Sequence, residues 1–116
     1  MVVLESELLI LRAMCQGAPD GRVWNDAVEI LATYEFRDNL HQVVFDTLRE
    51  MNTDEPRIIQ GLLGARLTLR GFPDVDLTSF FAPHNLRRPI LTAMMQSVKG
   101  LARRRSRLDS SLLPTY

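Results

Sequence analysis

The sequence predicts an all-α protein, a small orthogonal bundle of about five to six helices that ends in a longer C-terminal helix. Two observations predict this class: apolar residues recur at spacings of three and four along most of the chain, and no alternating run is long enough for a strand. The 116 residues, 46% of them hydrophobic and 24% charged, provide for one core rather than two. We expect a single domain over residues 1–108 and a mobile tail over residues 109–116.

The first two helices are predicted from two apolar stripes separated by a turn. The first stripe consists of Leu4, Leu8, Leu11 and Cys15. Gly17 is a natural stop for this helix, and the turn-rich segment GAPDG occupies residues 17–21. The second stripe consists of Trp24, Val28 and Leu31. This second helix is short and is expected to end around Tyr34.

The third helix is expected to begin at Asp38 or Asn39, since the side-chain oxygen of either residue can cap a helix N-terminus. If Asn39 is the cap, Gln42 stands at the capping-box position. The apolar stripe of this helix consists of Leu40, Val44, Leu48 and Met51.

The segment Thr53-Asp54-Glu55-Pro56 predicts the start of a fourth helix, because proline lacks an N–H donor that the first turn would not use. The apolar positions that follow are Ile58, Ile59, Leu62, Leu63 and Leu67, and the helix is expected to end at Gly71. Gly61 and Gly64 weaken this helix by about 1 kcal/mol each relative to alanine. They indicate either close approach by another helix or a tolerated cost.

A loop with one short helical turn at about residues 77–81 is expected to lead into the longest helix, from about Leu86 to Leu108. Its apolar stripe is the candidate self-association surface and consists of Ile90, Met94, Val98 and Leu101. The stripe and its flanking residues offer more apolar surface than a small domain can cover, so we expect an isologous homodimer. The alternative is that the stripe packs inside one monomer.

The charges limit the possible partners. Fourteen basic residues balance fourteen acidic ones, so binding to nucleic acid or to an anionic membrane would have to be local. The candidate nucleic-acid contact is a basic cluster of Arg103, Arg104, Arg105 and Arg107. Such a cluster also complements the negative end of a helix dipole, and no aromatic residues are interleaved with it. Nucleic acid is therefore the weaker expectation.

The chain carries the features of a cytoplasmic protein. Its one cysteine, Cys15, excludes an internal disulfide framework, and the opening MVVLESELLI lacks the pattern of a signal peptide. No apolar run approaches the roughly 20 residues that a membrane span needs. We therefore expect a cytoplasmic location and no membrane association.

We expect no enzymatic activity, metal or cofactor. The sequence lacks the patterns HxxxH, ExxH, CxxC, GxSxG and GxxxxGK[ST], and the two histidines, His41 and His84, stand apart. His41 is expected to be a packing residue, with one ring nitrogen bonded to a backbone carbonyl or a carboxylate. One core is expected to contain Trp24, Phe36, Phe45 and Leu48.

The set Phe36, His41 and Phe45 resembles a motif of the N-terminal domain of DnaB-type replicative DNA helicases. In that family, an aromatic residue near the end of one helix precedes a short loop and a helix that carries a histidine and, one turn later, an aromatic. LESELL at residues 4–9 and VEILATYEF at residues 28–36 also resemble the family's first helices. Three elements thus match in the right order.

The pattern of Leu67, Arg70 and Gly71 resembles the end of the family's next helix. The chain departs from the family where Asp38 or Asn39 replaces the usual proline, and where the region after Gly71 is shorter. It also lacks the ATPase domain. The resemblance implies a protein-interaction and oligomerisation domain linked to DNA replication, which docks a primase or a replicative helicase and does not unwind DNA.

Overall fold

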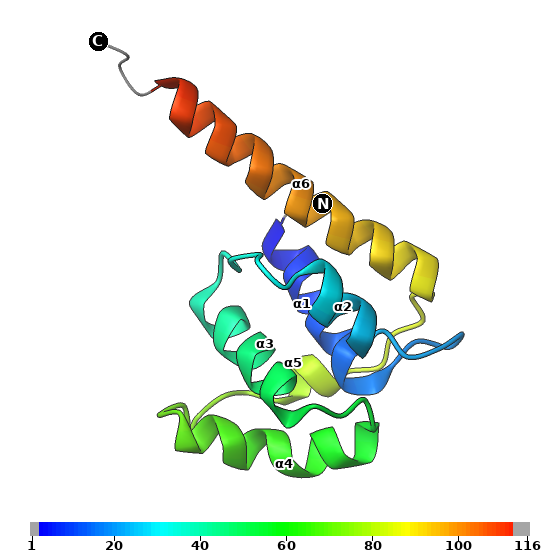
Figure 1. Ribbon diagram of the computed structural model, residues 1–116. Helices are drawn as coiled ribbons and strands as arrows, with labels where there is room; N and C mark the ends of the chain where they lie inside the picture. The colour runs from blue at the N-terminus through cyan, green and yellow to red at the C-terminus, as the bar shows by residue number, and fades with distance from the viewer. Residues whose placement is uncertain (1–2, 113–116) are drawn as a thin grey trace.

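The computed structural model describes residues 3–112, and the side chains of the last helix up to residue 102. Over these residues the chain forms helices and no strand, so the predicted all-α class is confirmed (Figure 1). The helices are α1 (Val3–Gln16), α2 (Trp24–Ile30), α3 (Asn39–Met51), α4 (Pro56–Leu69), α5 (Thr78–Phe81) and α6 (Arg88–Leu112). None of them is long and apolar enough to cross a bilayer.

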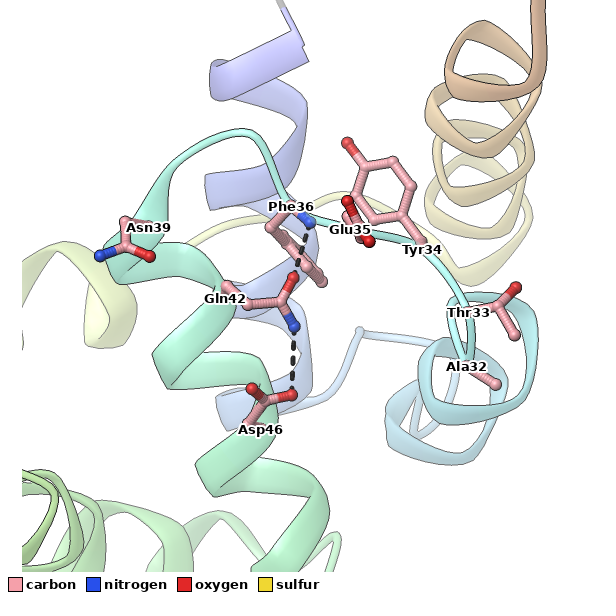
Figure 2. A pocket seen from close by; sticks show the side chains of 8 residues that line it. All are labelled: Ala32, Thr33, Tyr34, Glu35, Phe36, Asn39, Gln42 and Asp46. Atoms are coloured by element: carbon pink, nitrogen blue, oxygen red, sulfur yellow. Dashed lines mark hydrogen bonds between the residues drawn. The ribbon is translucent and has the colours of Figure 1, made fainter. Parts of the chain in front are cut away.

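Asp38 is the residue that caps α3. Its side chain accepts hydrogen bonds from the backbone amides of Leu40 (2.8 Å) and His41 (3.2 Å). Gln42 therefore forms no capping box; it accepts from the backbone N–H of Phe36 (2.7 Å) and donates to Asp46 (3.1 Å), as Figure 2 shows. The start of α3 is thereby tied to the loop that precedes it.

Helix α1 is the central element of the bundle, because it packs against each of the other five helices. Its buried residues are Ser6, Glu7, Ile10, Leu11, Ala13, Met14 and Cys15. The predicted stripe was wrong only at Leu4, which is exposed, since Leu8 is half-buried and packs against the core. A helix with neighbours on several sides buries more than one narrow stripe.

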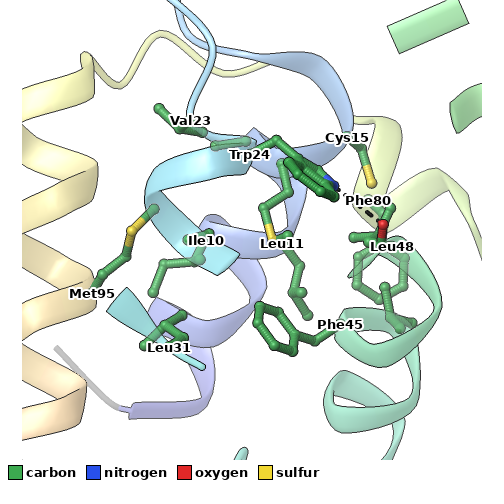
Figure 3. Close-up of a cluster of buried hydrophobic side chains, with 14 of the residues drawn as sticks. Ile10, Leu11, Cys15, Val23, Trp24, Leu31, Phe45, Leu48, Phe80 and Met95 are labelled. Atoms are coloured by element: carbon green, nitrogen blue, oxygen red, sulfur yellow. Dashed lines mark hydrogen bonds between the residues drawn. The ribbon is translucent and has the colours of Figure 1, made fainter. Parts of the chain in front are cut away.

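The predicted core of Trp24, Phe36, Phe45 and Leu48 is confirmed, because all four side chains are buried in one cluster. In Figure 3, Trp24, Phe45 and Leu48 lie close to Leu11 of α1. The indole Nε1 of Trp24 donates to the carbonyl of Leu48 (3.2 Å), so this buried polar group is satisfied. The rings of Phe36 and Phe45 pack with their centroids 4.9 Å apart.

Helix α4 begins at Pro56, as predicted, and faces the core with Ile59, Leu63 and Leu67. The two glycines in this helix have different surroundings. A Cβ added at Gly64 would lie 3.2 Å from Cδ1 of Leu77, whereas one added at Gly61 would meet nothing within 4 Å. Close packing therefore accounts for Gly64 but not for Gly61.

Helix α6 packs along α1 and α2 and then projects beyond the helical head, which we define as residues 3–87 (Figure 1). Its first turn is held by Arg88, whose guanidinium donates to Asp26 (2.7 and 2.9 Å) and whose backbone N–H donates to Asp20 (2.8 Å). The helix extends to Leu112, beyond the predicted end at Leu108. The projection makes the molecule elongated, at 55 × 34 × 23 Å.

Candidate functional site

The polar centre of the protein is the carboxylate of Glu7, whose side chain is fully buried in α1. Its Oε2 accepts a hydrogen bond from the hydroxyl of Tyr34 (2.6 Å) and one from the backbone N–H of Arg37 (2.7 Å). Its Oε1 lies 3.0 Å from Nδ1 of His41 and accepts from the backbone N–H of Asp38 (3.3 Å). Both oxygens are thus occupied.

One short segment supplies all of these partners. Residues 34–41 contain the end of the α2–α3 loop and the first turn of α3, and they lie against the N-terminal half of α1. The Asp38 cap fixes where α3 starts and so places His41 within reach of Glu7. The carboxylate therefore acts as a buried anchor for this loop.

Hydrogen bonding keeps this carboxylate charged. Burial acts to raise the pKa of Glu7, but the hydrogen bonds from His41, Tyr34 and the two backbone amides outweigh burial and lower it below its ordinary value. Burial, with the neighbouring charge of Glu7, raises the pKa of Tyr34, so the phenol stays protonated and donates. The network can therefore hold a buried charge without exposing it to solvent.

The geometry agrees with the packing role predicted for His41. Its side chain is buried, its ring meets that of Phe80 edge-on with centroids 6.4 Å apart, and its Nδ1 contacts a carboxylate. The predicted partner type was thus right, but Glu7 itself was missed. Glu7 shares a helical spacing with the buried Ile10 and Met14, and this was the available signal.

An open hollow lies on the outer side of the same loop, between the end of α2 and the first turns of α3 (Figure 2). It has a volume of about 450 Å³ and is lined by Ala32, Thr33, Tyr34, Glu35, Phe36, Asn39, Gln42 and Asp46. Gln42 and Asp46 already bond each other on its wall. The hollow is therefore a solvated depression with polar groups engaged in holding the loop.

The candidate self-association residues of α6 divide between the core and the surface. Ile90 is 51% exposed and Leu101 is 41% exposed, and Met94 is half-buried. Val98, however, is buried and belongs to the core, and so its assignment to an outer surface is corrected. The core face of α6 is formed by Leu91, Met95 and Val98, because these residues point toward α1 and α2.

The candidate nucleic-acid contacts, Arg103, Arg104, Arg105 and Arg107, have side chains that lie outside the described residues. The helical backbone through these positions is described, and it belongs to the part of α6 that projects beyond the head (Figure 1).

A second exposed apolar surface was missed by the sequence reasoning. Ile58 and Leu62 were listed with Ile59 and Leu63 as apolar positions of one helix, without a distinction between faces, but they face solvent with Leu69 on the outer side of α4. The apolar run therefore contains two rows on different faces of one helix.

Two further groups complete the chemistry of the described residues. Among residues 3–102, whose side chains the structure describes, no three His, Cys, Asp or Glu side chains are grouped so as to hold a metal ion. Cys15 is buried, and burial raises the pKa of its thiol to about 12, so the thiolate that reacts is scarce at neutral pH.

Comparison of the chain with models of protein families, with curated proteins and with solved structures finds no match. The resemblance to the N-terminal domain of DnaB-type replicative helicases therefore stays a prediction based on Phe36, His41 and Phe45.

Proposed function

We propose that the chain is a non-enzymatic, helical protein-interaction domain that forms a homodimer through α6. The observation that carries this proposal is the outer stripe of α6, defined as Ile90, Met94, Ser97 and Leu101. Its two large ends, Ile90 and Leu101, are 51% and 41% exposed on a helix that continues past the head. Burying them against a second copy would remove apolar surface from water.

The buried network supports a scaffold role for the polar residues that would otherwise suggest catalysis. Glu7, Tyr34 and His41 bond one another, and both carboxylate oxygens of Glu7 are occupied. In this arrangement the carboxylate holds the fold, and a substrate would have to displace the donors that keep it charged.

The spacing of the outer stripe suits an antiparallel, isologous pair. With the two-fold axis between Met95 and Gln96, Ile90 lies opposite Leu101 of the partner subunit, and Met94 lies opposite Ser97 of the partner subunit. Met94 of each protomer then meets the smaller Ser97 of the partner subunit, which favours close approach of the two helices. The same contacts occur twice, as a two-fold interface requires.

Oligomeric state tests this proposal. Sedimentation velocity should give a dimer for the parent chain and a folded monomer for the double variant Ile90→Glu, Leu101→Glu, because two carboxylates would enter the apolar contact from each side. The matched control is Leu69→Glu on α4, where the parent side chain is 84% exposed, and this variant should remain a dimer. A monomeric parent at high concentration would refute the pairing.

The resemblance to the helicase family extends the proposal to the cellular process in which the domain acts. We place the domain in DNA replication, with a primase or a replicative helicase as the protein that it docks. A co-purification of the tagged chain with each purified candidate tests this setting, and binding should depend on the folded head.

DNA binding is the second candidate function, and one observation favours it. Helix α6 carries the positions of Arg103, Arg104, Arg105 and Arg107 beyond the head, where a duplex could approach them. Binding to a generic duplex should then weaken as salt rises and vanish when the four arginines are replaced by alanine. Binding that survives this replacement would exclude the cluster as its cause.

A further inference from the structure

Helix α4 presents an apolar stripe to solvent that has no covering element in the head. The stripe consists of Ile58, Leu62, Ala65 and Leu69, all exposed, at successive spacings of four, three and four. Residues at these spacings lie on one side of a helix, over about 16 Å of its length. Such a row matches the apolar seam of a helix that packs against another helix.

Packing within the head does not account for a glycine beside this row. Gly61 costs helix stability, yet the space next to its Cα is open, with nothing within 4 Å of an added Cβ. Gly64, in contrast, is closely packed against Leu77. An exposed glycine next to an apolar row lets the backbone of an incoming helix approach closely.

The charges within α4 itself have one sign, and the exposed Glu55 at its N-cap lies 3.7 Å from Arg22 of the preceding segment. Helix α4 contains Arg57 and Arg66 and no acidic residue. Both arginines are exposed, and neither forms an ion pair with another residue of the described chain, whereas Arg70 at the end of the helix pairs with Glu50. The surface therefore complements a partner that carries acidic side chains beside an apolar seam.

We propose that the α4 stripe docks an amphipathic helix of another protein, with acidic residues flanking its apolar seam. A second copy of this chain fits less well, because two α4 helices would bring their unpaired arginines together. The surface is also separate from the dimer contact, since α4 and α6 lie at opposite ends of the molecule (Figure 1). The inference therefore does not depend on pairing through α6.

Two synthetic peptides test the proposal. Both are amphipathic helices with leucine at the seam positions; one has glutamate at the flanking positions and the other has lysine there. In a titration of the ¹⁵N-labelled full chain, the glutamate peptide should shift the amides of residues 58–69 and bind about tenfold more tightly than the lysine peptide. Replacing Arg57 and Arg66 by alanine should remove most of this difference.

Matched leucine variants distinguish docking at the α4 stripe from non-specific hydrophobic binding. Leu62→Ser should abolish binding of the glutamate peptide, whereas Leu101→Ser on α6, with a similar exposure in the parent (41% against 43%), should leave binding unchanged. Gly61→Ala should weaken binding although it stabilises the fold.

Three results would overturn the proposal: no binding of the glutamate peptide, equal binding of both peptides, or amide shifts outside α4. Sedimentation of Leu62→Ser provides a fourth test. A change in oligomeric state in this variant would mean that a second copy, and not another protein, occupies the stripe.

Discussion

Glu7 is the residue on which the fold around the α2–α3 loop depends. A buried charge is costly unless several donors surround it, and here four donors from residues 34–41 do so. The same bonds fix the side chain of His41 and the backbone at Arg37 and Asp38. Removing the charge should therefore affect the loop and the start of α3 together.

Replacement of Glu7 by glutamine should lower the free energy of unfolding by about 3 kcal/mol or more, because an amide cannot accept from all four donors and brings a donor of its own among them. The control is Glu5→Gln, which alters an exposed side chain of the same helix turn and should change stability by less than about 0.5 kcal/mol. Urea denaturation of both variants measures the difference. Equal midpoints would show that the buried carboxylate does not hold the fold.

The lowered pKa of Glu7 also predicts an acid dependence. A carboxyl group whose pKa is lower in the folded state than its ordinary value of 4.5 stabilises the fold fully above that value. This contribution is lost as the pH falls through the lower folded-state pKa. Unfolding free energies measured from pH 7 down to pH 3 should therefore decline below about pH 4.5 in the parent and decline less in Glu7→Gln. Parallel pH profiles would rule out Glu7 as the source.

At the level of helices, local signals could be read from the sequence and tertiary ones could not. Asp38 marks a helix start because its own side chain accepts from the first backbone amides, and Pro56 marks one because it has no N–H that needs a partner. The structure agrees with both. Glu7 could not be assigned its role, because its donors lie about 30 residues away in the chain. Likewise, only the position of α4 against α3 decides that Ile59 is buried and Ile58 is exposed.

Replacement of Gly61 by alanine should stabilise the protein by about 0.5 to 1 kcal/mol, because alanine is the better helix former and its methyl group enters open space. The melting temperature should rise by several degrees. Gly64→Ala is the matched comparison; its methyl group would press on Leu77 at 3.2 Å, so its gain should be smaller or absent. A larger gain at Gly64 than at Gly61 would contradict the packing described for α4.

Phe45 links α3 to the central helix, and its side chain is fully buried in the common core. Phe45→Ala should cost about 3 to 5 kcal/mol through lost burial and the cavity that remains, which is enough to unfold a domain of this size. Thermal melting followed by circular dichroism measures the loss. A variant that melts like the parent would place Phe45 outside the core.

At the scale of the whole molecule, two surfaces are available on opposite sides of one head. Helix α6 leaves the head with its outer stripe uncovered, and α4 carries a second apolar row flanked by arginines. The sequence predicted that α6 would hold excess apolar surface, but it overstated the width of that surface, because Val98 packs against the head. How much of the apolar surface of α6 stays exposed depends on how closely the helix packs against its neighbours.

The orientation of the α6 pair can be measured with spin labels. An introduced cysteine can be labelled selectively, because Cys15 is buried and its pKa is raised to about 12. Labels at Ser97 lie near the proposed two-fold axis, whereas labels at Arg87 lie at the far ends of the paired helices.

The dipolar distances in these two labelled variants distinguish antiparallel pairing through α6 from other arrangements. We predict a short distance between the two Ser97 labels, set by helix axes about 8 to 10 Å apart. The two Arg87 positions are offset by about 25 Å along the helix axis, so their separation should be greater by roughly 15 to 20 Å. Short distances at both positions would mean a parallel pair, and the absence of dipolar coupling at both would mean that α6 does not join two copies.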